Sequence, residues 1–125
     1  MPPQAKLRLL LLEDSADDAD LLAIELAGAG LDTELRRVAT RDAYVAALAG
    51  FAPDIVVSDY DLPGFSGGEA LLMARAHDPA LPFVVLSGFV AEDRPADDRA
   101  HGADAWMCKD DLHDVPAVLR RLLGR

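Results

Sequence analysis

Cysteine and aromatic residues are scarce in this sequence of 125 residues, which has one cysteine and 6% aromatics. A single thiol cannot form an internal disulfide, so a disulfide scaffold is excluded and a cytoplasmic location is expected. Cys108 falls in an apolar run, where we expect it to pack inertly in the core. It shows no ligand spacing with the three histidines, which argues against a zinc site.

Long apolar runs and basic residues are also in short supply. The N-terminal run Leu7–Leu12 is interrupted by Arg8 and is too short for a signal peptide, and no stretch approaches the roughly 20 apolar residues of a membrane span. Acidic residues outnumber basic ones by 22 to 12, giving a net charge of −10. We therefore expect a soluble protein without a direct nucleic-acid or membrane partner, whose charge favours a cation or a basic protein surface.

Short apolar runs alternate with helical patterns along the chain. The expected strands are Leu7–Leu12, Asp32–Val38, Asp54–Ser58, Phe83–Leu86 and Ala105–Cys108. The expected helices run from Ala16 to about Gly28, from Arg41 to Ala49, from Leu71 to about Asp78, from Ala91 to His101 and from Leu112 to Leu123, with Ser15 and Thr40 as N-caps. The segment Asp61–Gly68 is expected to be a loop. This alternation predicts one α/β domain, with a core at about residues 7–124 and helices on both faces of a parallel sheet.

Polar residues stand where the predicted strands end. Acidic residues follow the first and third strands, a serine follows the fourth and a lysine the fifth: Glu13, Asp14, Asp59, Ser87 and Lys109. Open α/β sheets bind ligands at this carboxyl edge. If the strand order is 2-1-3-4-5, the three acids meet at its switch point. Taken singly, the acids and Ser87 could be caps and Lys109 a solvated lysine, but together the five positions favour a site.

Three carboxylates in one crevice require compensation. Two like charges about 4 Å apart repel by about 4 kcal/mol at an effective dielectric constant of about 20. A cation or a retained proton offsets this, and a few hard oxygen ligands suit Mg²⁺ with several waters. Mg²⁺ beside a carboxylate suggests phosphoryl transfer, with Asp59 as the nucleophile. Mg²⁺, Lys109 and the Ser87 hydroxyl would then face the phosphoryl oxygens.

Four segments carry a family resemblance: LLLLEDSADD, PDIVVSDYDLPGFSG, FVVLSG and GADAWMCKDD. They resemble the receiver domain of two-component response regulators, over about Leu7 to Leu123. The resemblance implies a flavodoxin-like (CheY-like) three-layer α/β/α fold with a five-stranded parallel sheet in the order 2-1-3-4-5. It also implies that Asp59 is the phosphoacceptor, which a sensor histidine kinase or a histidine phosphotransfer protein phosphorylates, and that a downstream protein is the target.

The resemblance assigns metal and switch roles as well. Asp14 and Asp59 would ligate Mg²⁺ directly with the backbone carbonyl of Asp61, and Glu13 would act through water. Ser87 and Trp106 take the places of the family's switch residues. Phosphorylation would then alter the face made by the last two predicted helices and the strand between them, which is also the family's usual dimer contact.

Three positions depart from the common family pattern. Lys109 is followed by Asp110-Asp111 in place of proline, as in a subset of receivers often found alone or joined to sensor-kinase modules. Asp61 adds negative charge where attacking water enters, and Phe89 replaces a smaller residue. We predict that Phe89 and Asp61 tune the lifetime of the phosphoryl group.

Other functions fit the sequence less well. The pattern Asp59-Tyr60-Asp61 is a D-x-D, which haloacid-dehalogenase-type phosphatases use, but theirs follows the first strand of a much longer chain. A flavodoxin needs a Ser/Thr-rich phosphate loop after its first strand, where this chain is acidic. A degenerate receiver that only binds proteins would not need the complete acceptor site, and a receiver module of a hybrid sensor kinase remains an alternative. We therefore expect a signalling receiver rather than an enzyme.

Overall fold

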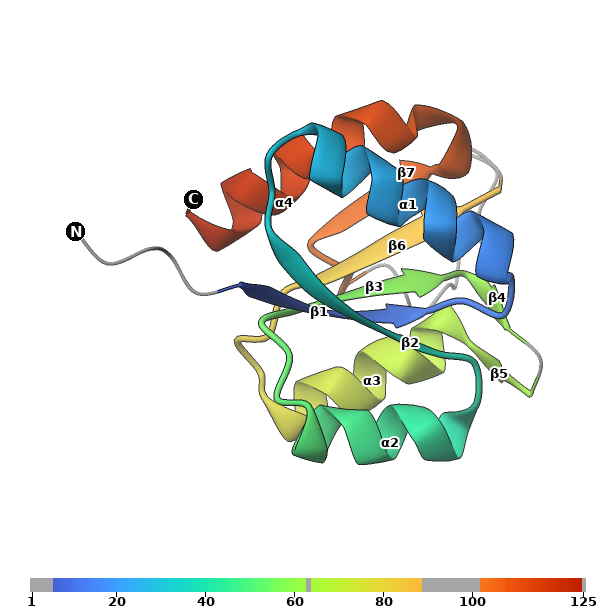
Figure 1. Cartoon of the computed structure of the whole chain (residues 1–125). Coiled ribbons are helices and arrows are strands. Elements are labelled where there is room, and N and C mark those ends of the chain that lie inside the picture. The colour runs from blue at the N-terminus through green and yellow to red at the C-terminus, as the bar shows by residue number, and fades with distance from the viewer. Residues whose placement is uncertain (1–5, 63, 89–101, 125) are drawn as a thin grey trace.

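A five-stranded parallel sheet forms the centre of the computed structural model, which describes residues 6–62, 64–88 and 102–124 (Figure 1). Its order is β2-β1-β3-β6-β7, and every neighbouring pair is parallel. The strands are β1 (Leu7–Leu12), β2 (Thr33–Val38), β3 (Ile55–Asp59), β6 (Phe83–Ser87) and β7 (Ala105–Cys108). Counting only these strands, the order is the predicted 2-1-3-4-5.

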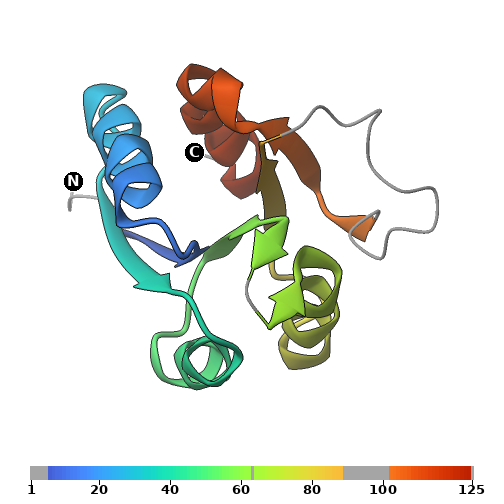
Figure 2. The same ribbon diagram turned by 90° about the vertical axis from the view of Figure 1, so that its right-hand side faces the viewer.

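Helices cover both faces of the sheet, as Figures 1 and 2 show. Leu22 of α1 and Leu119 of α4 pack with Leu9 of β1 on one face. On the other face, Leu48 of α2 packs with Leu10 of β1 in the cluster that also contains residues of α3. The helices are α1 (Ala16–Gly28), α2 (Arg41–Gly50), α3 (Gly67–His77) and α4 (Val115–Leu123). Burial on both faces explains why β1 is an almost uninterrupted apolar run, and the three-layer prediction is confirmed.

Side-chain caps begin the first two helices, as predicted. The Ser15 hydroxyl accepts a hydrogen bond from the Asp18 amide at 3.2 Å, and the Thr40 hydroxyl accepts one from the Ala43 amide at 3.2 Å. Each cap satisfies one backbone donor that the first helical turn leaves open. The predicted helix Ala91–His101 lies outside the described residues. None of the described helices has the length and apolar character needed to cross a membrane.

The segment predicted as a loop is more ordered than expected. It holds an antiparallel hairpin of β4 (Asp61–Leu62) and β5 (Phe65–Ser66), and α3 begins at Gly67 rather than at Leu71. The Gly67 amide donates to the Tyr60 carbonyl at 2.9 Å, and an added Cβ would lie 3.3 Å from the Tyr60 Cα. Here glycine therefore allows the helix to start against the hairpin, and it does not mark a flexible stretch.

The last predicted helix also begins differently. Lys109–Asp114 forms a 3₁₀ segment, η3, and the α-helix starts only at Val115. Within η3, Asp111 has φ −106° and ψ 32°, which are not helical angles. Pro116 follows directly in the first turn of α4, where a missing amide proton costs nothing. The prediction that one helix runs over Leu112–Leu123 is therefore wrong in its first turn.

The amino end of β7 is tied to α3 and β6. The Arg75 guanidinium donates to the Leu81 carbonyl, to the Gly102 carbonyl at 3.3 Å and to the Asp104 carboxylate at 3.1 Å. The same Asp104 oxygen accepts the Phe83 amide at 2.8 Å. One ion pair therefore joins the helix, the start of β6 and the residues that lead into β7.

Tyr44 provides a test of how α2 and α3 are joined. Its side chain is fully buried, and its hydroxyl donates to the Ala70 carbonyl at 2.7 Å. We predict that Tyr44→Phe lowers the free energy of unfolding by about 0.5–1.5 kcal/mol, measured by urea denaturation at pH 7.

The pH dependence of that difference serves as a check. Burial raises the pKa of Tyr44 above its ordinary value of 10.0. Above pH 10 the tyrosine of the unfolded chain loses its proton while the buried tyrosine of the folded protein keeps it. The wild type therefore loses stability as the pH rises. The gap between wild type and Tyr44→Phe should then narrow above pH 10. A constant gap would show that the tyrosine titrates alike in both states.

Candidate functional site

The predicted site residues converge at the carboxyl edge of the sheet. Glu13 and Asp14 follow β1, Asp59 is the last residue of β3, and Lys109 opens η3 directly after β7. The adjacency of β1 and β3 brings the acids together. Lys109 reaches them because Cys108, which precedes it, pairs with Ser87 at the end of β6.

Lys109 is the cation that compensates these acids. Its Nζ lies 2.8 Å from Glu13 Oε1 and 3.3 Å from Asp59 Oδ2. The Glu13 side chain is only 4% exposed and that of Asp59 13%. Carboxylates this far from water need a charged partner, because an uncompensated buried charge is strongly destabilising. The lysine therefore makes the acidic crevice tolerable in the folded protein.

A fourth carboxylate belongs to the cluster and was missed from the sequence. Asp18 Oδ2 in the first turn of α1 lies 2.8 Å from Lys109 Nζ. Acids are common in a first turn because they complement the helix dipole, so Asp18 does not stand out in the sequence. Only the packing of α1 beside η3 reveals its contact with Lys109, and no local pattern indicates it.

Burial and charge shift the protonation equilibria of this group in opposite ways. Burial raises the pKa of Glu13, although the hydrogen bonds from Lys109 and the Ser15 amide oppose that shift. Burial alone would lower the pKa of Lys109, but the hydrogen bonds to Asp18 and Glu13 and the charge of Asp59 outweigh it and raise that pKa. The lysine is therefore firmly charged.

Three of the acids could also hold a metal ion. One carboxylate oxygen from each of Glu13, Asp14 and Asp59 lies within 4.8 Å of the others. Asp14 is exposed, so part of the cluster faces solvent. Hard oxygen donors with room for water are the ligands that Mg²⁺ prefers. The main chain of Asp61 begins β4 two residues after Asp59, and the donor set fits Mg²⁺.

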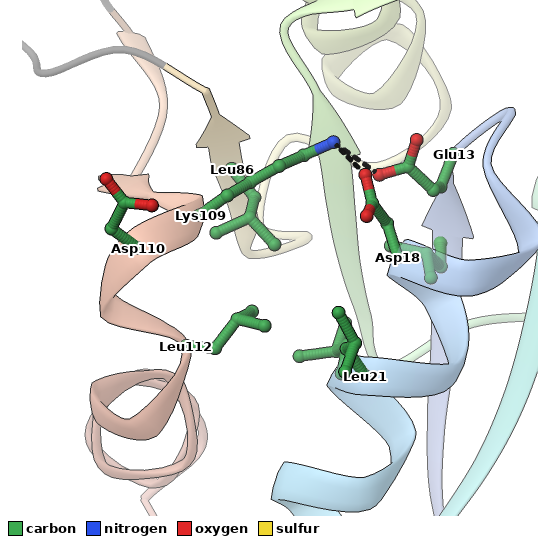
Figure 3. Close-up of a pocket in the computed structure, with 9 residues that line it drawn as sticks. Glu13, Asp18, Leu21, Leu86, Lys109, Asp110 and Leu112 are labelled. Atoms are coloured by element: carbon green, nitrogen blue, oxygen red, sulfur yellow. Dashed lines mark hydrogen bonds and ion pairs between the residues drawn. The ribbon is translucent and has the colours of Figure 1, made fainter.

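A cavity of about 220 Å³ opens beside the cluster, between α1 and η3 (Figure 3). Leu21 of α1 and Leu112 of η3 point toward each other across it, and Leu86 lines it from β6. At the polar end, the Lys109 ammonium faces the adjacent carboxylates of Glu13 and Asp18. The crevice therefore joins a charged end to an apolar one.

Known proteins share both the sequence pattern and this fold. The chain is 35% identical over 80 residues to the DNA-binding response regulator MtrA of Mycolicibacterium paratuberculosis, a match that covers 64% of this chain and 34% of MtrA. The chain thus spans about a third of that relative. No protein-family model matches the chain.

Two solved structures show the same architecture. The CheY-like response regulator receiver domain of Methylobacillus flagellatus superimposes with a TM-score of 0.79 at 21% identity, over 94% of this chain and 99% of that one. The receiver domain of the sensor histidine kinase PA1611 of Pseudomonas aeruginosa, which has a magnesium ion in its active-site cleft, gives a TM-score of 0.81 at 20% identity, over 97% and 100%. This chain therefore resembles response regulator receiver domains in both sequence and fold.

The remaining predicted site residues lie around the cluster. Ser87 ends β6 and is 1% exposed. The partly buried Trp106 in β7 contacts Tyr60, the residue after Asp59, with ring centroids 5.0 Å apart. Cys108 was expected in the core but is only partly buried, because β7 is an edge strand. Phe89 lies outside the described residues.

The two lysines of the chain, Lys6 and Lys109, allow a matched test of the charge balance at this site. We predict that Lys109→Met in metal-free buffer at pH 8 lowers the free energy of unfolding by about 1–3 kcal/mol, because Glu13 keeps its acidic neighbours and loses its cation. Adding Glu13→Gln to Lys109→Met should restore part of the lost free energy of unfolding. Lys6 is exposed, so Lys6→Met should change little. Equal unfolding curves for the two lysine variants would contradict the compensating role of Lys109.

Proposed function

We propose that this receiver domain is the phosphoacceptor of a two-component or phosphorelay system, with Asp59 as the residue that is phosphorylated. The observation that carries the proposal is the setting of the Asp59 carboxylate. It lies 3.3 Å from the Lys109 ammonium and within 4.8 Å of oxygens of Glu13 and Asp14. A nucleophile beside a fixed cation and a group of metal-binding oxygens is the arrangement that phosphoryl transfer requires.

The transfer exchanges one bond to phosphorus for another. A carboxylate oxygen of Asp59 attacks the phosphorus of a phosphohistidine donor, so an O–P bond forms as the P–N bond breaks. The electron pair of the broken bond stays on the imidazole nitrogen, and the product is an acyl phosphate on Asp59. Lys109 neutralises one phosphoryl oxygen, and the Ser87 hydroxyl donates to another.

Mg²⁺ is the cofactor that this donor set supports. Asp14 and Asp59 would bind it directly, together with the backbone carbonyl of Asp61, and Glu13 would act through water. When bound, Mg²⁺ supplies positive charge against the phosphoryl oxygens. The magnesium ion in the cleft of the PA1611 receiver supports the same cofactor for this chain.

The partners follow from this chemistry. The phosphoryl donor is a sensor histidine kinase or a histidine phosphotransfer protein in the cytoplasm, and a downstream protein reads the result. A net charge of −10 favours basic surfaces on both. The assembled cluster argues against a degenerate receiver, since a module that only binds proteins has no need of paired acids around a partly buried lysine.

The output side of the proposal involves Ser87, Trp106 and the face around β7 and α4, which is also the proposed homodimer contact. Ser87 would turn toward the phosphoryl group and Trp106 would rotate, which changes the face around β7 and α4 for the next partner. Tyr60 links the two regions, since it follows Asp59 and contacts Trp106. The roles of Asp61 and Phe89 in setting the phosphoryl lifetime stay predictions.

Acetyl phosphate tests the acceptor. We predict that incubation with acetyl phosphate and Mg²⁺ adds the mass of one phosphoryl group to the intact protein, and that chelation of Mg²⁺ abolishes the addition. Asp59→Asn should remain unmodified, whereas Asp42→Asn, which changes an exposed aspartate of α2, should react like the wild type. A phosphorylated species that persists in Asp59→Asn would exclude Asp59 as the acceptor.

Trp106 tests the switch, because it is the one tryptophan of the chain. We predict that phosphorylation shifts its fluorescence emission, since rotation would separate its ring from Tyr60 and change its solvent contact. Emission is followed after acetyl phosphate is added, with Asp59→Asn as the control that should stay constant. An unchanged spectrum from protein shown by mass to be phosphorylated would rule out the rotation.

A further inference from the structure

Asp18 gives Lys109 a third carboxylate partner, from a different element of the fold. The Nζ atom lies 2.8 Å from Asp18 Oδ2, as close as it is to Glu13 Oε1 and closer than its 3.3 Å to Asp59 Oδ2. An ammonium group has three N–H donors. The three carboxylates therefore match its full donor capacity, and Asp18 is the one that reaches it from a helix (Figure 3).

Asp18 stands apart from the acids that could bind a metal ion. Those acids are Glu13, Asp14 and Asp59, and Asp18 is not in the group. Its side chain is 41% exposed, compared with 4% for Glu13. A divalent cation among the other three would draw on the charges of Glu13 and Asp59 and repel the ammonium. Asp18 then remains as the partner whose charge is not shared with the cation.

We propose that Asp18 is a positioning residue, which holds the Lys109 ammonium beside Asp59 while Mg²⁺ occupies the acidic group. The inference rests on the proposed function, because a lysine held there is ready to neutralise a phosphoryl oxygen. Without Asp18, repulsion by the bound cation turns the long and flexible lysine side chain away from the cluster. Phosphoryl transfer to Asp59 then loses part of the contribution of Lys109.

The neighbouring Asp17 separates this role from a general effect of charge. Asp17 and Asp18 both lie in the first turn of α1, so Asp17→Asn and Asp18→Asn remove the same charge and the same complement to the helix dipole. In the described part of the chain, Lys109 forms ion pairs with Glu13, Asp18 and Asp59 and not with Asp17. A difference between the two variants therefore reports the contact with Lys109.

NMR of the lysine side chains tests the positioning without any phosphorylation. With two lysines in the chain, isotope-labelled lysine yields separate signals for exposed Lys6 and for Lys109. We expect the two Hε protons of Lys109 to stay inequivalent, as in an immobilised side chain, in wild type and Asp17→Asn saturated with Mg²⁺. In Asp18→Asn they should become equivalent once Mg²⁺ is added. Equal Lys109 signals in both variants would overturn the inference, whether or not Asp59 accepts a phosphoryl group.

The rate of phosphorylation tests the consequence. At saturating Mg²⁺, Asp18→Asn should react with acetyl phosphate about threefold to tenfold more slowly than Asp17→Asn, the range of a partly exposed charge-assisted contact. Asp18→Glu should restore most of the rate. In a Lys109→Met background Asp18→Asn should cause no further loss, since both act through one group. An equal loss with and without Lys109 would show that Asp18 acts in another way.

These two measurements keep the proposals distinct. If the wild type is not phosphorylated but the Lys109 signals respond to Asp18→Asn, the proposed function fails and the positioning role stands. If the wild type is phosphorylated and Asp18→Asn matches Asp17→Asn in both rate and spectrum, only the positioning role fails.

Discussion

The ammonium group of Lys109 is the interaction on which the rest of the site depends. It joins a carboxylate after β1, another at the end of β3 and a third in α1. Without it, acids drawn from three separate elements would repel one another at short range. With it, the three elements are tied together at one edge of the sheet.

The sheet order explains why these groups meet at all. β1 lies in the sheet between β2 and β3, and β3 lies between β1 and β6. Parallel strands end at the same edge, so residues far apart in the sequence lie together there. Apolar clusters on both faces hold the strands in register, and the polar residues are thus confined to the ends of the strands. The alternation of apolar strands and helices along the sequence therefore produces both the core and the position of the site.

Much of this could be predicted from the sequence, for identifiable reasons. Short apolar runs separated by helical patterns indicate a layered fold, and the residues at the run ends, Glu13, Asp14, Asp59 and Lys109, meet because the carboxyl ends of parallel strands meet. The strand order came from the family resemblance, since alternation alone does not specify which strands are neighbours. The roles of these residues in phosphoryl transfer stay proposals.

What could not be predicted depends on contacts that no local pattern encodes. Gly67 suggests a loop in isolation, but it begins α3 close against the backbone of Tyr60, which leaves little space for a side chain. Asp18 looks like an ordinary first-turn acid until α1 is seen to lie beside η3. In each case a tertiary neighbour outweighs the local preference.

The ion pair between Arg75 and Asp104 has a mechanical consequence for this edge of the sheet. It anchors the amino end of β7 to α3 and β6, while the opposite end of the same short strand leads directly into Lys109. A strand that is held at one end can tilt but cannot slide along its neighbour. The anchor therefore fixes the register of β7 against β6, and with it the height at which Lys109 leaves the sheet beside the acids.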